Sequence, residues 1–173
     1  AAALIMSAIT QLPIEECTGR GTGVNDEQLA VKIKTLKTVY SKHQLNESAQ
    51  EPYQLLSKVG GYEIAMMTGA YLAAFNNRMV IVVDGFIATA ALLLSHQIEP
   101  NILQNCIFAH TSGEQGHQKM LHYLGVTPLL NLGMRLGEGT GSAIAIPIIR
   151  SAVAFLNEMA SFEQAAVSSK SVY

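Results

Sequence analysis

The feature that most constrains the fold is a continuous apolar run at residues 79–83, Met-Val-Ile-Val-Val, which ends abruptly in Asp84-Gly85. β-Branched residues favour strands, and a strand that is apolar on both faces is typical of a parallel sheet buried between helices. A helical segment at 87–97 follows at once, and a weaker copy of the pattern gives a strand at 105–109 and a helix at 114–124. This alternation predicts an α/β fold with a parallel sheet.

Further helices are predicted from apolar spacing and from capping residues. Asn25 is a candidate N-cap, with Gln28 three residues on as in a capping box. The expected helices, besides those flanking the strands, are an Ala-rich helix at 1–10, an amphipathic helix at 26–43, a helix at 62–76 whose small residues suit close packing, a mainly helical segment at 140–160 and a short last helix from 161. Residues 128–138 are expected to be irregular or a short strand.

Composition suits one folded domain. The chain has 173 residues, of which 49% are hydrophobic and 14% charged, so disorder is not expected. Such low charge suggests that a partner subunit or further chain covers some apolar surface. The net charge is −2 without a Lys/Arg cluster, which favours neither nucleic acid nor an anionic membrane as a partner.

Two further observations bear on localisation. Cys17 and Cys106 are far apart, and we expect both to be reduced, buried and inert in a cytoplasmic protein. The most apolar long segment, 142–156, contains Pro147 and Arg150, so no transmembrane helix is predicted.

The amino terminus, Ala1 to Thr10, starts like the middle of a buried helix, without Met or a basic region. It does not have the pattern of a signal peptide. We therefore expect this chain to be the carboxy-terminal portion of a longer protein. The expected division is residues 1–140 in the α/β domain and 141–173 as helices of a small domain.

The candidate catalytic residue is Glu138, an acidic residue between Gly137 and Gly139 just before the apolar helix. Glycines on either side allow a tight turn and a close approach of ligand, and the helix start places free backbone N–H groups nearby. The pattern indicates a carboxylate that moves a proton beside a polar ligand. A surface turn with a solvated Glu is the alternative.

Asp84, Ser112 and Glu138 all follow strand-like segments. In open α/β sheets ligands bind at the carboxyl ends of the strands, so these three residues are expected to meet in one crevice. Asp84 is a candidate for holding a ribose hydroxyl, although capping of the helix that follows is an alternative. Ser112 lacks the Gly-x-Ser-x-Gly pattern of a nucleophile elbow.

Two other motifs are ambiguous. The loop Gly19-Arg20-Gly21-Thr22-Gly23 either offers N–H groups to a phosphate or is a connector, and Lys34 on the next helix either reaches an anion or is solvated. His110, His117 and His122 do not predict a metal site. His117 and His122 are five residues apart, which separates them around a helix, and no acidic ligand completes the set.

Together the segments resemble the nicotinate-nucleotide:dimethylbenzimidazole phosphoribosyltransferase family of cobalamin synthesis. The blocks that carry the resemblance run in family order over nearly the whole chain. They are Gly19–Asp26, Val59–Ala65, Val83–Ala90, His110–His117 and Leu132–Gly141, with the tail Asn157–Phe162.

The resemblance implies a Rossmann-like α/β domain with a small helical domain, in a homodimer without a metal or redox cofactor. It implies transfer of ribose 5-phosphate from nicotinate mononucleotide to 5,6-dimethylbenzimidazole, which gives α-ribazole 5′-phosphate and nicotinate. Glu138 falls on the family's general base. Gly23 and Lys34 fall near nucleotide phosphate or product, Asp84, Gly85 and Ser112 on the ribose–nicotinate side, and Leu136 beside the benzimidazole.

One departure from the family is that a similar length of chain precedes this region in its members. That half supplies early strands, a second acidic residue and much of the benzimidazole pocket. The chain is therefore expected to be a poor catalyst alone. A non-catalytic nucleotide-binding or dimerisation fragment is the alternative function.

Overall fold

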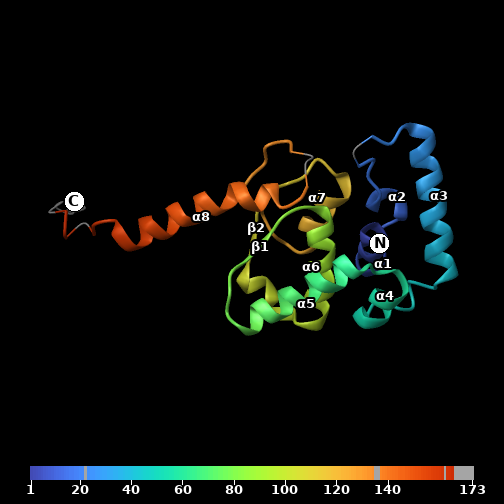
Figure 1. Ribbon diagram of the computed structural model, residues 1–173, viewed down its shortest axis with the longest axis horizontal. Helices are drawn as coiled ribbons and strands as arrows, with labels where there is room; N and C mark the ends of the chain where they lie inside the picture. Colours follow the sequence, from blue (N-terminus) through green and yellow to red (C-terminus); the bar gives the residue numbers. More distant parts are fainter. Residues whose placement is uncertain (22, 135–136, 162, 166–173) are drawn as a thin grey trace, which may run out of the picture.

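The computed structural model describes residues 1–21, 23–134, 137–161 and 163–165. The elements in chain order are α1 (Ala2–Thr10), α2 (Ile14–Cys17), α3 (Asp26–Lys42), α4 (Pro52–Val59), α5 (Tyr62–Asn76), β1 (Ile81–Val83), α6 (Phe86–Ile98), the 3₁₀ helix η1 (Pro100–Asn105), β2 (Cys106–Phe108), α7 (Gln115–Tyr123) and α8 (Thr140–Glu158). Helices dominate, and the predicted α/β class with a parallel strand pair is confirmed (Figure 1).

The sheet consists of β1 and β2, which pair in parallel with Ile81 opposite Cys106 and Val83 opposite Phe108. An irregular segment continues the parallel arrangement on the far side of β2. The N–H of Leu129 donates to Phe108 O (2.9 Å), and residue 130 forms an isolated bridge with His110. The expected short strand within 128–138 is therefore present as single bridge pairing.

β1 is shorter than the apolar run that predicts it. Arg78 has a φ of 55°, and the N–H of Met79 donates to Ala74 O (2.9 Å), which closes the carboxyl end of α5. Met79 and Val80 therefore precede the strand instead of belonging to it, and they are 57% and 64% exposed. The hydrogen bonds at the carboxyl end of α5, and not the apolar side-chain pattern, therefore determine where β1 begins.

The core has two parts that share α6. Around α1 every residue from Ala2 to Ile9 is buried, and α6 packs against α1 with buried Ala90, Leu93 and Leu94. A second cluster joins Val83 of β1 and Phe108 of β2 to α6 and η1. The expectation that an apolar helix occupies residues 1–10 in the core is confirmed.

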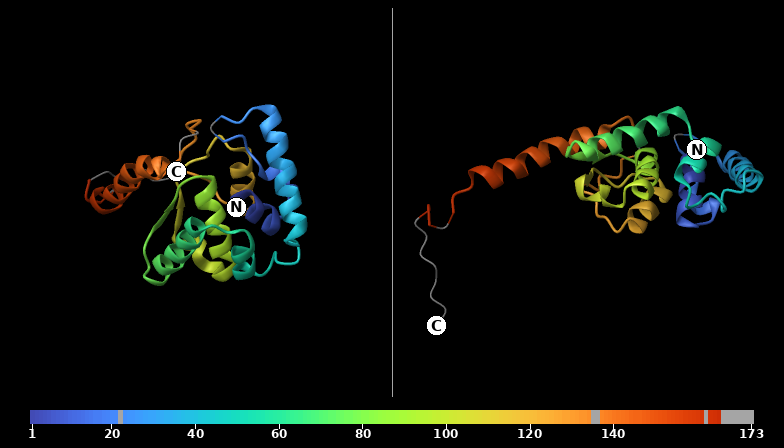
Figure 2. Two further views of the ribbon diagram at one scale, coloured as in Figure 1. Left: turned by 45° about the vertical axis from the view of Figure 1, so that its right-hand side comes forward. Right: turned by 90° about the horizontal axis from the view of Figure 1, so that it is seen from below.

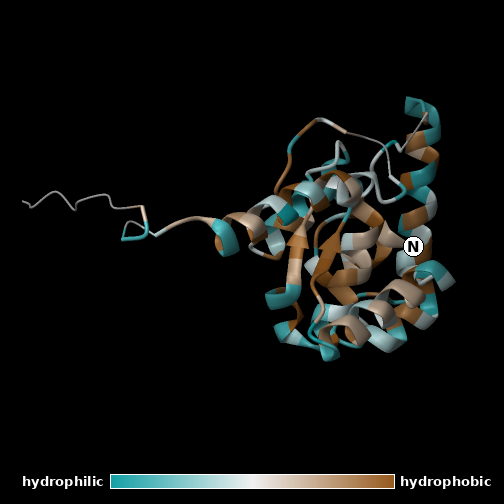
Figure 3. Ribbon diagram, turned by 60° about the vertical axis from the view of Figure 1, so that its left-hand side comes forward, coloured by the Kyte–Doolittle hydropathy of each residue, from teal (hydrophilic) through white to brown (hydrophobic). Residues whose placement is uncertain are grey.

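The apolar pattern of the strands predicted burial on both faces, but in the structure one face is more fully buried than the other. Val82 in β1 and Ile107 in β2, whose side chains alternate with the buried ones, are only half-buried among the described residues. In Figure 3 the two brown strands lie between the packed helices and the start of α8. The described helices thus cover one face of the strand pair more fully than the other.

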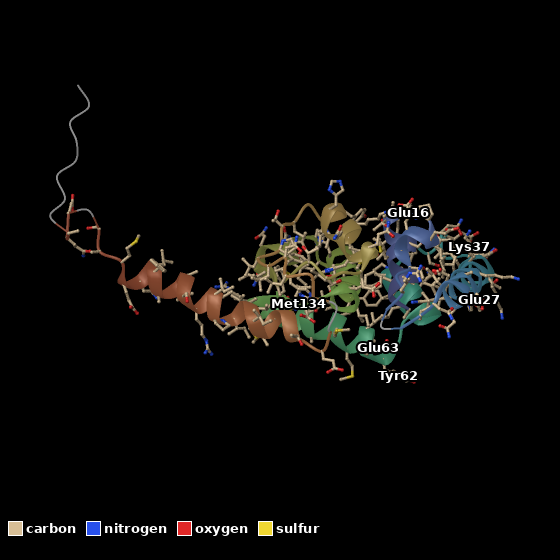
Figure 4. The ribbon with its side chains drawn as sticks, turned by 90° about the horizontal axis from the view of Figure 1, so that it is seen from above. Glu16, Glu27, Lys37, Tyr62, Glu63 and Met134 are labelled. Atoms are coloured by element: carbon tan, nitrogen blue, oxygen red, sulfur yellow. The ribbon has the colours of Figure 1, made fainter. Side chains whose placement is uncertain are left out.

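α3 and α5 match their predicted ranges closely. Asn25 accepts the N–H of Gln28 (2.9 Å), and the Gln28 side chain accepts the N–H of Asn25 (3.0 Å), so the capping box is confirmed. α3 forms one edge of the molecule, where Lys37 pairs with Glu15 of α2 (Figures 2 and 4). α4 is not among the predicted helices, although Pro52 occupies its first position, which is a common helix-start signal.

α8 projects from the body of the molecule as a long single helix (Figures 1 and 2). Of its large apolar side chains, Phe155 is 67% and Leu156 84% exposed, whereas Ala145 near its start is buried. By length and composition alone α8 would be able to cross a membrane, with a mean hydropathy of 1.3 over 18 residues. No transmembrane helix was predicted from the sequence, so this length and hydropathy of α8 differ from that prediction. A single helix of this kind is weak support for a membrane span.

The two cysteines are free thiols. Cys17 is buried as expected, whereas Cys106 is only half-buried. Burial raises the pKa of each thiol to about 11, so both are protonated at neutral pH. This protonation agrees with the expectation that they are unreactive.

Candidate active site

A cleft of about 740 Å³ opens at the carboxyl ends of β1 and β2. Its apolar lining includes side chains of α1, α3, α5 and α6. Much of its polar lining comes from the turns after the two strands and before α8, with Lys32 of α3 as a further charged residue. The lining includes Ala1–Ala3, Gly19, Lys32, Leu36, Met67, Tyr71, Asp84–Ala88, His110, Ser112, Glu114, Gly137–Gly139 and Ser142.

Four of the predicted site residues meet in this cleft, namely Asp84, Gly85, Ser112 and Glu138. The predicted convergence of Asp84, Ser112 and Glu138 at the strand ends is therefore confirmed. Gly23 and Lys34 are exposed and do not line it. Leu136 lies outside the described residues.

Glu138 occupies the tight turn that its glycine neighbours predict. Its φ is 62°, and Gly139 follows with a φ of 80° as the N-cap of α8. A left-handed backbone is uncommon for a residue with a side chain, and it lies next to the helix start. The turn presents an exposed carboxylate to the cleft, close to backbone N–H groups at the start of α8.

Asp84 makes hydrogen bonds that neither sequence-based alternative anticipated. Its Oδ2 accepts the N–H of Gly139 (3.2 Å) and its Oδ1 accepts the N–H of Ser142 (3.1 Å). The carboxylate therefore caps α8, 55 residues or more away in sequence, and no side-chain cap bond to α6 is present. The negative charge suits a helix amino terminus, where the helix dipole is positive.

The loop after β2 is held by His117. The N–H of Ser112 donates to His117 Nδ1 (3.0 Å), so the proton of the neutral ring is on Nε2, which lies 3.0 Å from Thr89 Oγ1. Burial, and to a smaller extent the neighbouring His110, lowers the pKa of His117 to about 4. His117 is thus a neutral structural residue that fixes Ser112 beside the cleft.

The same loop also brings the Glu138 segment into place. The N–H of Thr111 donates to Leu130 O (2.8 Å) and that of Gly113 donates to Met134 O (2.9 Å). These bonds align the chain that leads into the Glu138 turn with the end of β2. The Ser112 Oγ in turn accepts the N–H of Glu114 (3.3 Å).

The lysine that reaches the cleft is Lys32, not the predicted Lys34. Lys32 Nζ donates to Gly19 O (2.8 Å) in the glycine-rich loop. Lys34 is two residues after Lys32, so its side chain is rotated by about 200° around the axis of α3 relative to that of Lys32. Lys34 is accordingly exposed to solvent. Helical periodicity relative to Leu36, which also lines the cleft, would have selected Lys32 from the sequence.

Two charged residues and one histidine of the cleft lining were not predicted as site residues, namely Lys32, Glu114 and His110. Glu114 lies directly against Gly19, where a Cβ would overlap its carboxylate, and His110 is almost fully buried. Within the described ranges, no group of three or more His, Cys, Asp or Glu residues is placed to hold a metal ion. The charged side chains of the described lining are therefore the carboxylates of Asp84, Glu114 and Glu138 and the ammonium group of Lys32.

An α/β fold with a cleft at the carboxyl ends of its parallel strands belongs to the class of proteins that bind their ligands at that edge of the sheet. A family model described as Phosphoribosyltransferase matches residues 1–167. The chain belongs to this phosphoribosyltransferase family.

Relatives with curated names agree with this assignment. The chain is 53% identical over 171 residues to a nicotinate-nucleotide–dimethylbenzimidazole phosphoribosyltransferase of Cupriavidus necator, covering 99% of this chain and 49% of the relative. A protein of the same name from Shewanella baltica is 52% identical over 167 residues, covering 96% and 46%. The chain thus spans about half the length of the curated relatives it matches.

Solved structures show the same fold. A crystal structure of CobT from Thermus thermophilus matches with a TM-score of 0.88 at 37% identity, over 96% of this chain and 49% of the other. A second structure, titled as the phosphoribosyltransferase of that organism, gives a TM-score of 0.86 at 34% identity over 97% and 48%. The resemblance inferred from the sequence blocks is confirmed at the level of family and fold.

Proposed function

We propose that this chain carries the general base of a phosphoribosyltransferase that moves ribose 5-phosphate from nicotinate mononucleotide to 5,6-dimethylbenzimidazole. The observation that carries the proposal is Glu138, on a left-handed turn between glycines at the mouth of the cleft. Relatives about half identical to this chain bear the name of that activity. The product would be the α-ribazole 5′-phosphate of the cobalamin lower ligand.

In the proposed reaction, one benzimidazole nitrogen forms a bond to C1′ of the ribose. The bond from C1′ to the nicotinate nitrogen breaks, and its electron pair stays on that nitrogen and neutralises the pyridinium. The second benzimidazole nitrogen becomes acidic, and its proton passes to the Glu138 carboxylate. No electrons are gained or lost overall, so we expect positioning and electrostatics to suffice without a redox cofactor.

The proposed substrate contacts follow the chemistry of the cleft. Gly85 and Ser112 would lie on the ribose–nicotinate side, and Lys32 is better placed than the predicted Gly23 and Lys34 for the nucleotide phosphate. Leu136 remains proposed beside the benzimidazole on the resemblance alone.

The apolar wall of the cleft, with Leu36, Met67, Tyr71 and Phe86, suits a flat aromatic base. Burial raises the pKa of Tyr71 to about 12, so the Tyr71 side chain is uncharged at neutral pH.

The assembly is also part of the proposal. We infer a cytoplasmic homodimer in which residues 141–173 contribute to a small helical domain and residues 1–140 to the α/β domain. The projecting α8, with exposed Phe155 and Leu156, supports a role in pairing. A biosynthetic reaction on soluble nucleotides supports the cytoplasmic location.

The test is Glu138→Gln in the longest natural gene product that contains this chain. The amide keeps the size of the side chain but cannot accept the proton, so we expect kcat to fall by about 10²–10⁴ with an unchanged circular dichroism spectrum. Glu47→Gln, at an exposed position outside the cleft, is the control and should keep full activity. A Glu138→Gln enzyme that turns over like the wild type would remove Glu138 from this role.

The alternative is a non-catalytic nucleotide-binding or dimerisation fragment. The apolar, incompletely covered strand face and α8 favour it for the isolated chain. Product formation from both substrates, measured for this chain and for the longer gene product, separates the two functions. Activity in neither, with retained nucleotide binding, would support the alternative.

A further inference from the structure

His110 is the most buried polar side chain of the cleft and has no hydrogen-bond partner among the described residues. It follows β2, is 1% exposed, and both ring nitrogens are inaccessible and unpaired. A buried polar group without a hydrogen-bond partner is destabilising, so the position of this imidazole needs a physical explanation. Its Nδ1 faces Asp84 Oδ1 at 3.6 Å, slightly beyond hydrogen-bond length.

The Asp84 carboxylate beside it is the group that fastens α8 to the strand end. Besides the two N–H groups that Asp84 accepts, Ser142 Oγ donates to Val82 O (3.2 Å). The start of α8 is thereby attached at three points to β1 and to Asp84, the residue that follows β1. One of these points, the N–H of Gly139, belongs to the residue next to Glu138.

Gly141 shows how closely α8 approaches this pair. A Cβ at Gly141 would overlap His110 Nδ1 and would lie 2.6 Å from Asp84 Oδ1. The imidazole, the carboxylate and the first turn of α8 therefore form one packed cluster. A displacement of any member moves the others, because no space is left between them.

We propose that His110 is a positioning residue for the general base. Its ring, packed with Nδ1 3.6 Å from Asp84 Oδ1, keeps the Asp84 carboxylate against the start of α8, and the carboxylate in turn fixes the Gly139 N–H and the left-handed Glu138 turn. This inference rests on the proposed function of Glu138. The ring nitrogens of His110 are buried, so they are not available to hydrogen-bond a substrate.

The left-handed backbone of Glu138 explains why a positioning residue is needed. A non-glycine residue with positive φ on an exposed turn is held only where its surroundings fix it. Without the anchor the turn would sample other conformations, and the carboxylate would be in place for proton transfer for a smaller fraction of the time. The expected effect falls on turnover and not on substrate affinity.

The experiment uses the longest natural gene product that contains this chain, with His110→Phe, His110→Gln, Asp84→Asn and a double variant of His110→Phe with Asp84→Asn. We expect His110→Phe to lower kcat about tenfold or more, with KM for nicotinate mononucleotide within about twofold. His110→Gln, which keeps a polar hydrogen, should recover part of the rate. The double variant should be no worse than the poorer single variant, because both act through one anchor.

The second readout does not depend on activity. Amide hydrogen exchange at Gly139 and Ser142 should be about tenfold faster in His110→Phe without substrate, because their acceptor is no longer held in place. The exposed His122, on α7 and outside the cleft, provides the control, and His122→Gln should change neither readout. If the wild type makes no product, the proposed function fails, while the exchange data still test the anchor.

Two results would overturn the proposal. One is a raised KM with unchanged exchange, which would make His110 a direct substrate ligand. The other is unchanged kcat and exchange in a folded His110→Phe protein. If the His110 variants do not fold, Gly141→Ala perturbs the same cluster from α8, and unaltered kcat and exchange in that variant would equally contradict the anchor.

Discussion

At the scale of single residues, the buried imidazole of His117 makes the free energy of unfolding of the chain depend on pH. Its pKa is lowered to about 4, mainly by burial, whereas an unfolded histidine titrates near 6.5. Between these values the unfolded chain binds more protons, so the free energy of unfolding rises with pH across the window. The contribution is fully present above about pH 6.5 and is lost as the pH falls toward 4, and its full size would be about 3 kcal/mol.

The measurement is urea unfolding of the wild type and of His117→Asn between about pH 7 and pH 4. The wild type should lose stability on acidification, and the variant, which lacks this titrating group, should lose clearly less. His122→Gln, which removes an exposed histidine of α7, should follow the wild type. Parallel curves for the wild type and His117→Asn would show that another group controls the acid sensitivity.

At the scale of elements, substitution of two helical glycines by alanine is expected to change the stability of the chain in opposite directions. Gly116 in α7 packs where a Cβ would lie 2.8 Å from Phe86 Cε2 and 3.1 Å from Cys17 O, whereas a Cβ at Gly69 in α5 meets no atom within 4 Å. Gly116→Ala should destabilise the chain by about 1–3 kcal/mol through overpacking. Gly69→Ala should stabilise it by about 0.5–1 kcal/mol, because alanine favours the helix.

Thermal unfolding of Gly116→Ala and Gly69→Ala, each compared with a wild-type chain of the same length, measures both changes in stability. A stabilised Gly116→Ala would mean that α7 can move away from α2 and α6. A destabilised Gly69→Ala would indicate that a surface covers Gly69 in the assembled protein.

The capping box of α3 gives a second prediction at this scale. Asn25→Ala removes the acceptor for the Gln28 N–H and should lower the free energy of unfolding by about 1 kcal/mol. Asn25→Asp retains an acceptor and adds a charge that suits a helix start, so it should be close to the wild type. Chemical denaturation of the three proteins measures both differences, and an equal loss in both variants would argue against the cap.

At the scale of the whole molecule, the exposed apolar residues of α8 predict self-association. Phe155, Leu156 and Val153 are each more than half exposed on a helix that leaves the body. An exposed apolar surface of this kind marks an interaction site. Sedimentation equilibrium at micromolar concentration should show a dimer for the wild type, and Phe155→Asp should shift it toward monomer by placing a charge in the interface.

Tyr62, 91% exposed at the start of α5, is the matched control (Figure 4). Tyr62→Asp should leave the association unchanged. Dissociation by Tyr62→Asp but not by Phe155→Asp would move the interface to α5, and a wild-type monomer would contradict the homodimer altogether.

The sequence by itself determined the local elements of this protein. The bounds of α5, the capping box at Asn25 and the turn at Glu138 follow from short-range hydrogen bonds and backbone sterics, which neighbouring residues encode. The parallel order of β1 and β2 follows from strand–helix alternation, and the topology then brings Asp84 and Ser112 to one cleft.

Only the tertiary structure decided which distant groups meet. Asp84 caps α8 because the helix start packs against the strand end, and no local pattern around either segment encodes that contact. His110 gave no signal beyond a histidine near others, yet packing buried it against Asp84. The helix ending that shortened β1 is a similar case, because backbone bonds of α5 outweighed the strand preference of Met79 and Val80. Contacts of this kind depend on how whole elements pack, and that is a property of the complete fold and not of any single segment.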